Sequence, residues 1–379
     1  MSTTTTDSAT AVPLLDLRLQ YAPLRDEVLA RVAEVLDGQA VCNGPACRTL
    51  EQEVAAYSNV AHAVSCSSGT DALILALMGL GIGCGDEVIT SPFTFFATAG
   101  SLWRQGVKPV FADIDPHTFN LDPRKIEDKI TERTRAIMPV HLFGQMADMD
   151  AIEAIARKHG LHVIEDAAQA IGATYKGAKA GERSAATALS FYPTKNLGGA
   201  GDGGMVLTPD ADLAQRMELF RNHGAGMGDV RYHHLEVGGN FRMDSVNAAY
   251  LSVKLKHLDA WHDARRRNAA WYDELLAGID DLRTPAVAEG CGSIYNQYVV
   301  RTPRRDALMA HLRERQIGCG VYYPLSLHEQ PCFAPLGYHT GDFPESERAA
   351  KEVLALPIYP ELTEAQVRVV AEAVRGFFG

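Results

Sequence analysis

Apolar strand-like runs alternate with helical patterns from about residue 48 to residue 210, and this alternation limits the fold more than any other feature. The strand-like runs are DEVITS (86–91), KPVFADI (108–114), RAIMPVHL (135–142) and LHVIED (161–166). Helical spacing covers residues 70–79 and 148–159. Apolar strands joined by helices form parallel sheets with helices on both faces. The sequence therefore predicts an α/β fold with a mostly parallel sheet flanked by helices.

The remainder of the chain has a different pattern, which begins with a long charged amphipathic stretch over residues 245–276. The segments that follow it are a strand-like run at 293–302, a helical pattern at 305–316, a strand-like run at 318–323 and a helical pattern at 363–377. A chain of 379 residues with 46% hydrophobic content usually forms more than one domain. We expect a disordered tail over residues 1–12, a large α/β domain over 13–250 and a smaller α+β domain over 251–379.

A lysine and two acids directly follow strand-like runs, at positions where α/β folds often have catalytic or ligand-binding residues. Lys195 follows the strand-like run 187–192 and precedes the glycine-dense stretch 198–204. Most lysines are solvated surface charges, but this setting also suits an amine that forms an imine close to a phosphate. Glu165 and Asp166 end an apolar run, which places them at the carboxyl edge of the predicted sheet, where such folds bind ligands. A carboxylate buried there needs a cation or a hydrogen-bond donor.

Small polar residues precede the helical pattern that begins at residue 70. Ser68, Gly69 and Thr70 stand at its start, where free N–H groups and the helix dipole favour a phosphate, although ordinary N-capping explains the same residues. Gly199, Gly201 and Gly204 satisfy the spacing GxGxxG, but the residues after them are MVLTPDADL and do not open a helix. A dinucleotide-binding motif requires that helix, so we reject a dehydrogenase.

Many ordered motifs together carry a family resemblance. They are LLDLRLQYAPLRDEV, CSSGTDAL, SPFTFFAT, PVHLFGQMADMDAI, VIEDAAQAIGATYKG, SFYPTKNLGGAGDGGMV, GGNFRMDSVNAAYL and LALPIYPELT. Over nearly its whole length the chain resembles the DegT/DnrJ/EryC1/StrS group of sugar aminotransferases, which are fold type I enzymes dependent on pyridoxal 5'-phosphate. One departure is Asp202 in GDGG, where many relatives have a glutamate.

The resemblance implies a role for each matching residue around the cofactor. Lys195 would form the Schiff base and move the proton, and Asp166 would pair with the ring nitrogen. Gln169 would approach the phenolic oxygen of the cofactor, and Phe95 would stack on its ring. On their own, a glutamine after a strand is usually surface and a phenylalanine in FTFFATAG is usually core.

The resemblance also implies phosphate and substrate contacts. Gly69, Thr70 and Ser190 would hold the phosphate within one subunit, and Asn240 would reach it from the neighbouring subunit of a homodimer. If this holds, the active sites are shared between subunits. His328 would line the sugar pocket, although a loop histidine is more often structural or exposed.

The implied function is transfer of an amino group from L-glutamate to C3 or C4 of a nucleotide-linked keto-sugar, which yields an amino sugar. One alternative is amination of a keto-inositol in an aminocyclitol pathway, and another is a non-catalytic regulatory relative. A third, the related sugar dehydratases, replaces the Schiff-base lysine with histidine. Lys195 therefore argues against a dehydratase.

Composition excludes several other classes of protein. The net charge of −11 and the lack of a basic run argue against nucleic-acid binding. The seven cysteines are scattered without CxxC spacing, so we expect reduced thiols and no metal site. The N-terminal residues lack the pattern of a signal peptide, and no apolar run reaches the roughly 20 residues of a membrane span. We expect a cytoplasmic enzyme.

Overall fold

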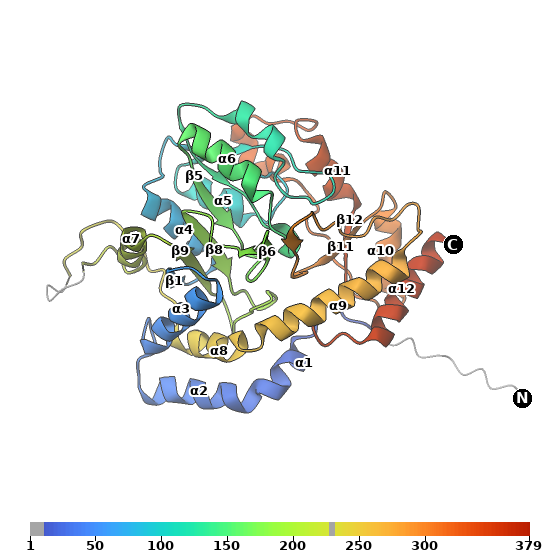
Figure 1. The fold of residues 1–379 in the computed structure, drawn as a ribbon, viewed down its shortest axis with the longest axis horizontal. Helices are drawn as coiled ribbons and strands as arrows, with labels where there is room; N and C mark the ends of the chain where they lie inside the picture. Colours follow the sequence, from blue (N-terminus) through green and yellow to red (C-terminus); the bar gives the residue numbers. More distant parts are fainter. Residues whose placement is uncertain (1–10, 227–231) are drawn as a thin grey trace, which may run out of the picture.

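The computed structural model describes residues 11–226 and 232–379 and is organised around a seven-stranded sheet of order β1-β9-β8-β5-β4-β2-β3 (Figure 1). Its strands are β1 (His62–Cys66), β2 (Glu87–Thr90), β3 (Lys108–Phe111), β4 (Thr134–Met138), β5 (His162–Asp166), β8 (Ala186–Ser190) and β9 (Gly204–Thr208). Only β9 runs antiparallel to its neighbours β1 and β8 in this sheet. The predicted mostly parallel sheet is confirmed.

Helices cover both faces of the sheet. They are α3 (Pro45–Tyr57), α4 (Gly69–Leu80), α5 (Ala97–Arg104), α6 (Met149–His159), α7 (Ala211–Arg221) and α8 (Ser245–Leu255). One buried cluster joins the sheet to α3, α6 and α8 and contains Val163, and the other joins it to α4, α5 and α7 and contains Ile164. Successive residues of β5 thus point to opposite faces. Because both faces are buried, the strands read as continuous apolar runs.

A smaller layer of helices packs on a two-stranded antiparallel sheet. It comprises α9 (Leu258–Leu276), β11 (Tyr298–Arg301), α10 (Arg305–Glu314), α11 (Pro344–Glu352), β12 (Val353–Leu356) and α12 (Glu364–Phe378). Figure 1 shows α9 running from the end of α8 toward α10 and α12. The predicted amphipathic stretch 245–276 is therefore two helices, α8 and α9, which are separated at Lys256 and His257.

The strand predicted at residues 318–323 is wrong. Only Gly320 in this segment makes a bridge, to Ala355, while β11 pairs with β12 instead. Residues 353–356 were missed because a four-residue apolar run that directly follows a helix cannot be distinguished from that helix by periodicity. Whether the domain boundary lies at residue 250 stays a prediction.

The remaining elements are short or peripheral. The helices are α1 (Leu17–Tyr21) and α2 (Arg25–Asp37), and β10 (Cys291–Gly292), β6 (Thr174–Tyr175) and β7 (Ala178–Lys179) form a three-stranded sheet. Short 3-10 helices occur at Ala22–Leu24, Pro123–Lys125, Glu127–Lys129, Leu142–Gly144, Leu327–Glu329 and Pro331–Leu336.

The N-terminal segment joins the small domain sooner than expected. Residues 1–10 of the predicted tail lie outside the described residues. Val12 is fully buried with the core of the small domain, and its N–H donates to the carbonyl of Gln316 at 3.2 Å. The prediction of a disordered tail is therefore wrong for Val12, because burial and backbone pairing hold this residue.

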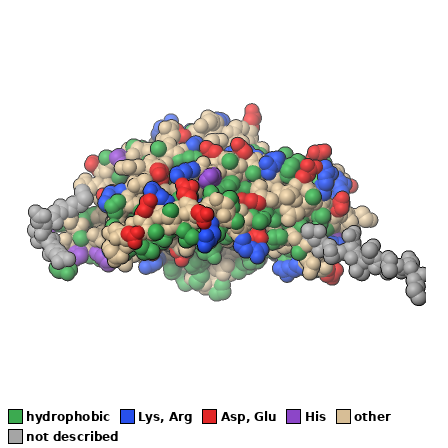
Figure 2. Space-filling model, turned by 90° about the horizontal axis from the view of Figure 1, so that it is seen from below, with side chains coloured by type: hydrophobic (Ala, Val, Ile, Leu, Met, Phe, Trp, Pro, Cys, Tyr) green, Lys and Arg blue, Asp and Glu red, His purple; other side chains and the backbone are tan. Residues whose placement is uncertain are grey.

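The surface facing the reader in Figure 2 has mixed charge. On this face Lys and Arg side chains lie among Asp and Glu side chains, with hydrophobic side chains between them. Opposite charges so close together largely cancel each other's field at a distance. Within residues 11–226 and 232–379, no helix has the length and apolar character needed to cross a membrane.

Candidate active site

A cavity of about 480 Å³ lies at the carboxyl ends of the parallel strands. Its walls come from segments at or directly after the ends of β1, β5 and β8, which contribute Ser68, Asp166 and Ser190. In a parallel sheet these ends meet at one edge, where backbone groups and loop side chains are free to contact a ligand. The fold therefore brings together residues that are far apart in the sequence.

Asp166 lies at the floor of this cavity. Its side chain is 5% exposed and accepts hydrogen bonds from Thr98 Oγ1 at 2.7 Å and from the Ala168 N–H at 3.2 Å. Burial raises the pKa of Asp166 above its usual value, although both hydrogen bonds and the charge of Lys195 act in the opposite direction. A carboxylate in this position would gain from a nearby cation, which would offset its desolvation.

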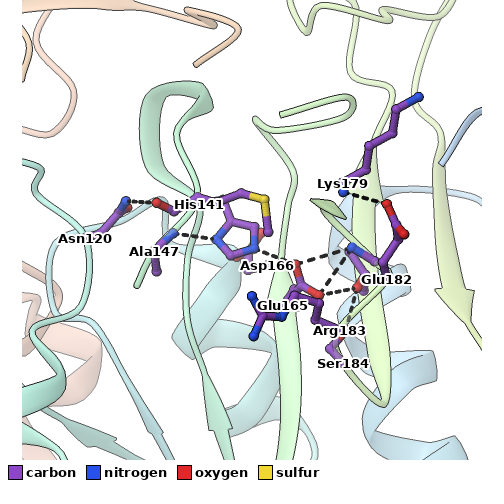
Figure 3. A network of polar contacts seen from close by, with 12 residues as sticks. Asn120, His141, Ala147, Glu165, Asp166, Lys179, Glu182, Arg183 and Ser184 are labelled. Carbon is purple, nitrogen blue, oxygen red and sulfur yellow. Dashed lines mark hydrogen bonds and ion pairs between the residues drawn. The ribbon is translucent and has the colours of Figure 1, made fainter. Parts of the chain in front are cut away.

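Glu165 points to the other face of the sheet and forms a separate network with His141 (Figure 3). The Ala147 N–H donates to His141 Nδ1 at 3.1 Å, so His141 Nε2 carries the hydrogen and donates to Glu165 Oε2 at 2.6 Å. Thr187 also donates to Glu165 at 3.1 Å. Burial by itself raises the pKa of Glu165, but hydrogen bonding, above all from His141, outweighs it and lowers that pKa. Of the two adjacent acids, Asp166 is therefore the one that faces the cavity.

Lys195 lines the same cavity from the turn after β8. Its N–H donates to the carbonyl of Tyr192 at 2.9 Å, which fixes the backbone of this turn. Burial lowers the pKa of Lys195 to about 8, although the charge of Asp166 opposes this shift. A substantial fraction of the amine is therefore neutral at mildly alkaline pH, as a nucleophile or base requires.

The first turn of α4 forms another wall, with Gly69 and Thr70 lining the cavity beside Ser190. The first N–H groups of an α-helix have no acceptor within the helix and can bind an anion. A Cβ at Gly69 would lie 2.6 Å from Ser190 Cβ, and a Cβ at Gly204 would lie 2.2 Å from the carbonyl oxygen of Ser68. Glycine at both positions lets the helix start approach β8 and β9 closely.

Gln169 and Phe95 also line the cavity, and both contact Tyr323. Gln169 accepts from the Phe143 N–H at 2.7 Å and donates to the Tyr323 hydroxyl at 3.0 Å. The Phe95 and Tyr323 ring centroids are 6.1 Å apart. Phe95 is 57% exposed in the single chain. These aromatic rings give the cavity an apolar boundary.

Two predicted site residues lie away from this cavity's lining. Asn240 is exposed and forms a backbone bridge with Asn222. His328 is 3% exposed, packs its ring on Phe343 and lies 3.1 Å from Glu347 Oε1. The structure therefore gives His328 contacts within the small domain, and its role at a sugar stays a prediction without support from its position.

Comparison with known proteins agrees with this geometry. The model of the DegT/DnrJ/EryC1/StrS aminotransferase family matches residues 23–375. The chain belongs to this family. The DegT/DnrJ/EryC1/StrS aminotransferases depend on pyridoxal 5'-phosphate.

The relatives include enzymes and a protein named as a regulator. A UDP-N-acetyl-3-dehydro-alpha-D-glucosamine 3-aminotransferase of Acidithiobacillus ferrooxidans is 46% identical, with 97% of this chain and 98% of that protein covered. A pleiotropic regulatory protein of Geobacillus stearothermophilus is 51% identical, with the same coverage of 97% and 98%. The crystal structure of S. venezuelae DesV in complex with a ketimine intermediate is 44% identical, has a TM-score of 0.94 and covers 97% of this chain and 98% of its own. The fold type I class is thereby confirmed.

The cavity suits the cofactor of this aminotransferase family in several independent ways. The N-terminus of α4 with Ser190 suits a phosphate, Asp166 suits a cationic ring nitrogen, and Lys195 is an amine on the same cavity. The close approach at Gly69 leaves its backbone, rather than a side chain, facing that phosphate position. The residue roles expected from the sequence are thus compatible with the structure and stay predictions.

Two contributors to the site were missed from the sequence. Thr98, which donates to Asp166, stands four positions after Thr94 in SPFTFFAT, a segment in which only Phe95 was predicted as a site residue. Tyr323 belongs to the segment expected to be a strand. For Thr98 the usable signal was its spacing of four from Thr94, but nothing local indicates that Tyr323 meets Gln169.

Proposed function

We propose that this protein transfers an amino group from L-glutamate to the C3 keto group of a nucleotide-linked sugar. The observation that carries the proposal is the convergence of Lys195, Asp166 and the start of α4 on one cavity in a member of an aminotransferase family. The choice of C3 over C4 is supported by the name of the 46% identical relative, a 3-aminotransferase acting on a UDP-linked keto-sugar.

Bound pyridoxal phosphate supplies an electron sink for the negative charge that develops at the carbon losing its proton. Asp166, ionised beside a cation, would hold a proton on the ring nitrogen and so maintain that sink. The hydrogen bond from Thr98 favours the ionised form of Asp166 against its burial and fixes the orientation of the carboxylate. The N–H groups of Gly69 and Thr70, with the Ser190 hydroxyl, anchor the phosphate.

Lys195 moves the proton in both half-reactions. Its Nζ takes up the proton that leaves Cα of the amino donor and later returns a proton to the carbon that receives the amine. With its pKa lowered to about 8, the amine can act as both base and acid near neutral pH. The rings of Phe95 and Tyr323 form an apolar side of the cavity.

We also propose a homodimer in which Asn240 reaches the phosphate position of the neighbouring subunit. The segment next to Asn240 carries exposed apolar side chains, with Leu235 60% and Val237 90% exposed. Large apolar side chains grouped at a surface are typical of subunit contacts. The exposed Phe95 and Tyr192 at the cavity are a matching surface for such a contact.

We place the enzyme in the cytoplasm. All seven cysteines are free thiols, among them the exposed Cys42, Cys84 and Cys332, as is usual for proteins of a reducing compartment.

A regulatory function is the second candidate, because a 51% identical relative is named a pleiotropic regulatory protein. Amination of a keto-inositol also stays open as an alternative acceptor chemistry. The chemically competent set of Lys195, Asp166 and Ser190 around one cavity favours catalysis.

The deciding experiment is a half-reaction in the absence of acceptor. Purified protein with added pyridoxal phosphate should show visible absorbance of the lysine-bound cofactor, and L-glutamate should convert it to the pyridoxamine form with release of one 2-oxoglutarate per site. Lys195→Ala should do neither. A UDP-linked 3-keto-sugar should then restore the original spectrum, whereas scyllo-inosose should not. A wild-type protein that binds cofactor but ignores every amino donor would refute catalysis and favour the regulatory function.

A further inference from the structure

The loop that follows Lys195 is held by side chains of a helix distant in sequence. We call residues 198–204 the glycine loop. Asn247 of α8 accepts from the Ala200 N–H at 2.9 Å and donates to the carbonyl of Asp202 at 2.8 Å. Lys254 of the same helix donates from Nζ to the carbonyl of Gly198 at 2.6 Å. Both side chains therefore bond the backbone of this loop rather than its side chains.

The spacing of Asn247 and Lys254 along α8 lets both side chains reach the glycine loop. Asn247 and Lys254 are seven positions apart, which is about two turns of helix, so both lie on one face of α8. They are 8% and 3% exposed. The helix itself is anchored independently of the loop, since α8 packs on α2 and α3. Hydrogen bonds from this anchored helix therefore restrict the movement of the glycine loop.

The first two residues of the glycine loop, Gly198 and Gly199, fit against their surroundings without room for a side chain. A Cβ at Gly199 would lie 2.5 Å from Asn247 Oδ1, and a Cβ at Gly198 would lie 2.0 Å from the carbonyl oxygen of Pro193. The Gly199 N–H donates to the carbonyl of Phe191 at 2.7 Å, which closes the chain around Lys195. A shift of the loop would therefore move the turn that carries Lys195.

Lys254 is in an environment that offers its charge little solvation. Its Nζ lies 5.2 Å from the ring centre of Tyr250 and 5.6 Å from that of Trp261. Burial lowers the pKa of Lys254 to about 8, against the charge of Glu361 and together with that of Arg265. Burying a lysine costs stability, and an apolar residue of similar length would be tolerated there as well or better. Stability alone thus gives no reason for a lysine at this position.

We propose that Asn247 and Lys254 are positioning residues, which clamp the glycine loop from one face of α8 and thereby hold Lys195 in the cavity. The inference rests on the proposed function of Lys195 for its catalytic consequence. The mechanical part, immobilisation of the glycine loop, is independent of any reaction. Neither side chain lines the cavity, so both act through the loop backbone.

The first test measures the loop in the cofactor-free protein by hydrogen–deuterium exchange. Lys254→Met removes the donor while keeping an unbranched chain, and Asn247→Ala removes both bonds to the loop. Each variant should accelerate exchange of the peptide covering residues 196–203 by about tenfold or more, with unchanged exchange in β5. Lys256→Met is the matched control, since Lys256 lies just after α8 and pairs with Glu27 at 2.8 Å away from the loop. It should leave the loop unchanged.

The second test measures the consequence for Lys195. Misplacement of a catalytic group by about 1 Å can cost up to about 100-fold in rate, so we expect kcat to fall by about 10- to 100-fold in both variants. The KM for L-glutamate should change by less than about threefold, because neither variant alters a residue that lines the cavity. Asn268→Ala, which removes another buried asparagine that bonds a carbonyl, that of Tyr359 at 2.8 Å, should retain kcat within about threefold.

The outcomes separate the clamp from the proposed reaction. Faster loop exchange with the predicted loss of kcat supports the inference. Wild-type loop exchange in both Lys254→Met and Asn247→Ala overturns it, as does a loss of kcat that the Asn268→Ala control shares. If the wild type shows no transamination but the exchange results hold, the clamp stands and the proposed function fails. Should Lys254→Met be insoluble, Asn247→Ala carries both measurements.

Discussion

The hydrogen bond from Thr98 to Asp166 allows a quantitative test of how the site maintains a buried carboxylate. Thr98 is fully buried on α5, and its hydroxyl donates to Asp166 Oδ2 at 2.7 Å. Thr98→Val replaces that hydroxyl by a methyl group of nearly the same volume. The substitution thus removes one donor from a carboxylate that is 5% exposed, with little change in packing.

A hydrogen bond to a charged group contributes about 1.5–3 kcal/mol. Its loss should therefore raise the pKa of Asp166 further, since the hydrogen bond from Thr98 acts to lower that pKa. Burial has already raised the pKa of Asp166 above its unfolded value of 3.8. The folded protein is therefore most stable while Asp166 is protonated, and part of its free energy of unfolding is lost as pH rises through the folded pKa. The deficit of Thr98→Val should therefore be small at acid pH and grow to about 1.5–3 kcal/mol at neutral pH.

Urea unfolding of cofactor-free protein between acid and neutral pH measures this difference directly. In the loaded enzyme, the acid limb of the kcat/KM profile should move toward higher pH, since the proposed role of Asp166 requires its ionised form. Thr98→Ser keeps the hydroxyl and should behave as wild type. Thr94→Val removes only the neighbouring hydroxyl, 3.0 Å from Thr98, and should lack the pH dependence. A stability deficit in Thr98→Val that does not vary with pH would refute the reasoning.

Other substitutions test the site from different sides. Lys195→Ala should abolish the visible absorbance of bound cofactor and slow transamination by about 10³-fold or more, as spectra and product assays will show. Gly69→Ala should push against Ser190 and cost about 1–3 kcal/mol with weaker cofactor binding in a titration, whereas Gly83→Ala, in open space, should not. Glu165→Gln should lower the free energy of unfolding in urea by about 1.5–3 kcal/mol at neutral pH. This deficit should shrink as pH falls, because the pKa of Glu165 is lowered in the folded protein and protonation at acid pH removes the stability that its carboxylate contributes. A deficit that grows toward acid pH would contradict this account of Glu165.

Local sequence patterns were sufficient for most of the large domain. Apolar runs predicted the strands that became β2, β3, β4 and β5, because a strand buried on both faces has a continuous apolar sequence. Helical spacing at 148–159 matches α6 within a residue. The same logic failed at 318–323, where a single bridge from Gly320 to Ala355 is too short to form a strand. The apolar content of a segment indicates that it is buried, whereas its pairing as a strand depends on which segment lies next to it in the fold.

The candidate site divides in a similar way. Asp166, Lys195 and Gly69 could be named from the sequence, because each stands directly after or before a recognisable element and the motifs around it resemble a family. The residue pattern placed Glu165 and Asp166 together at the end of one strand, but it did not show which of the two carboxylates faces the cavity. Alternation along β5 then turned one toward His141 and the other toward the cavity.

The sequence by itself therefore determined the fold class and the family and named candidate site residues, since these depend on local composition and short-range order. Only the tertiary structure decided which partners those residues have. Thr98 meets Asp166 across 68 positions of sequence, Gln169 meets Tyr323 across 154, and Lys254 meets Gly198 across 56. Such contacts arise when helices and sheet pack into one core, and no periodicity along the chain encodes a distance between segments that far apart.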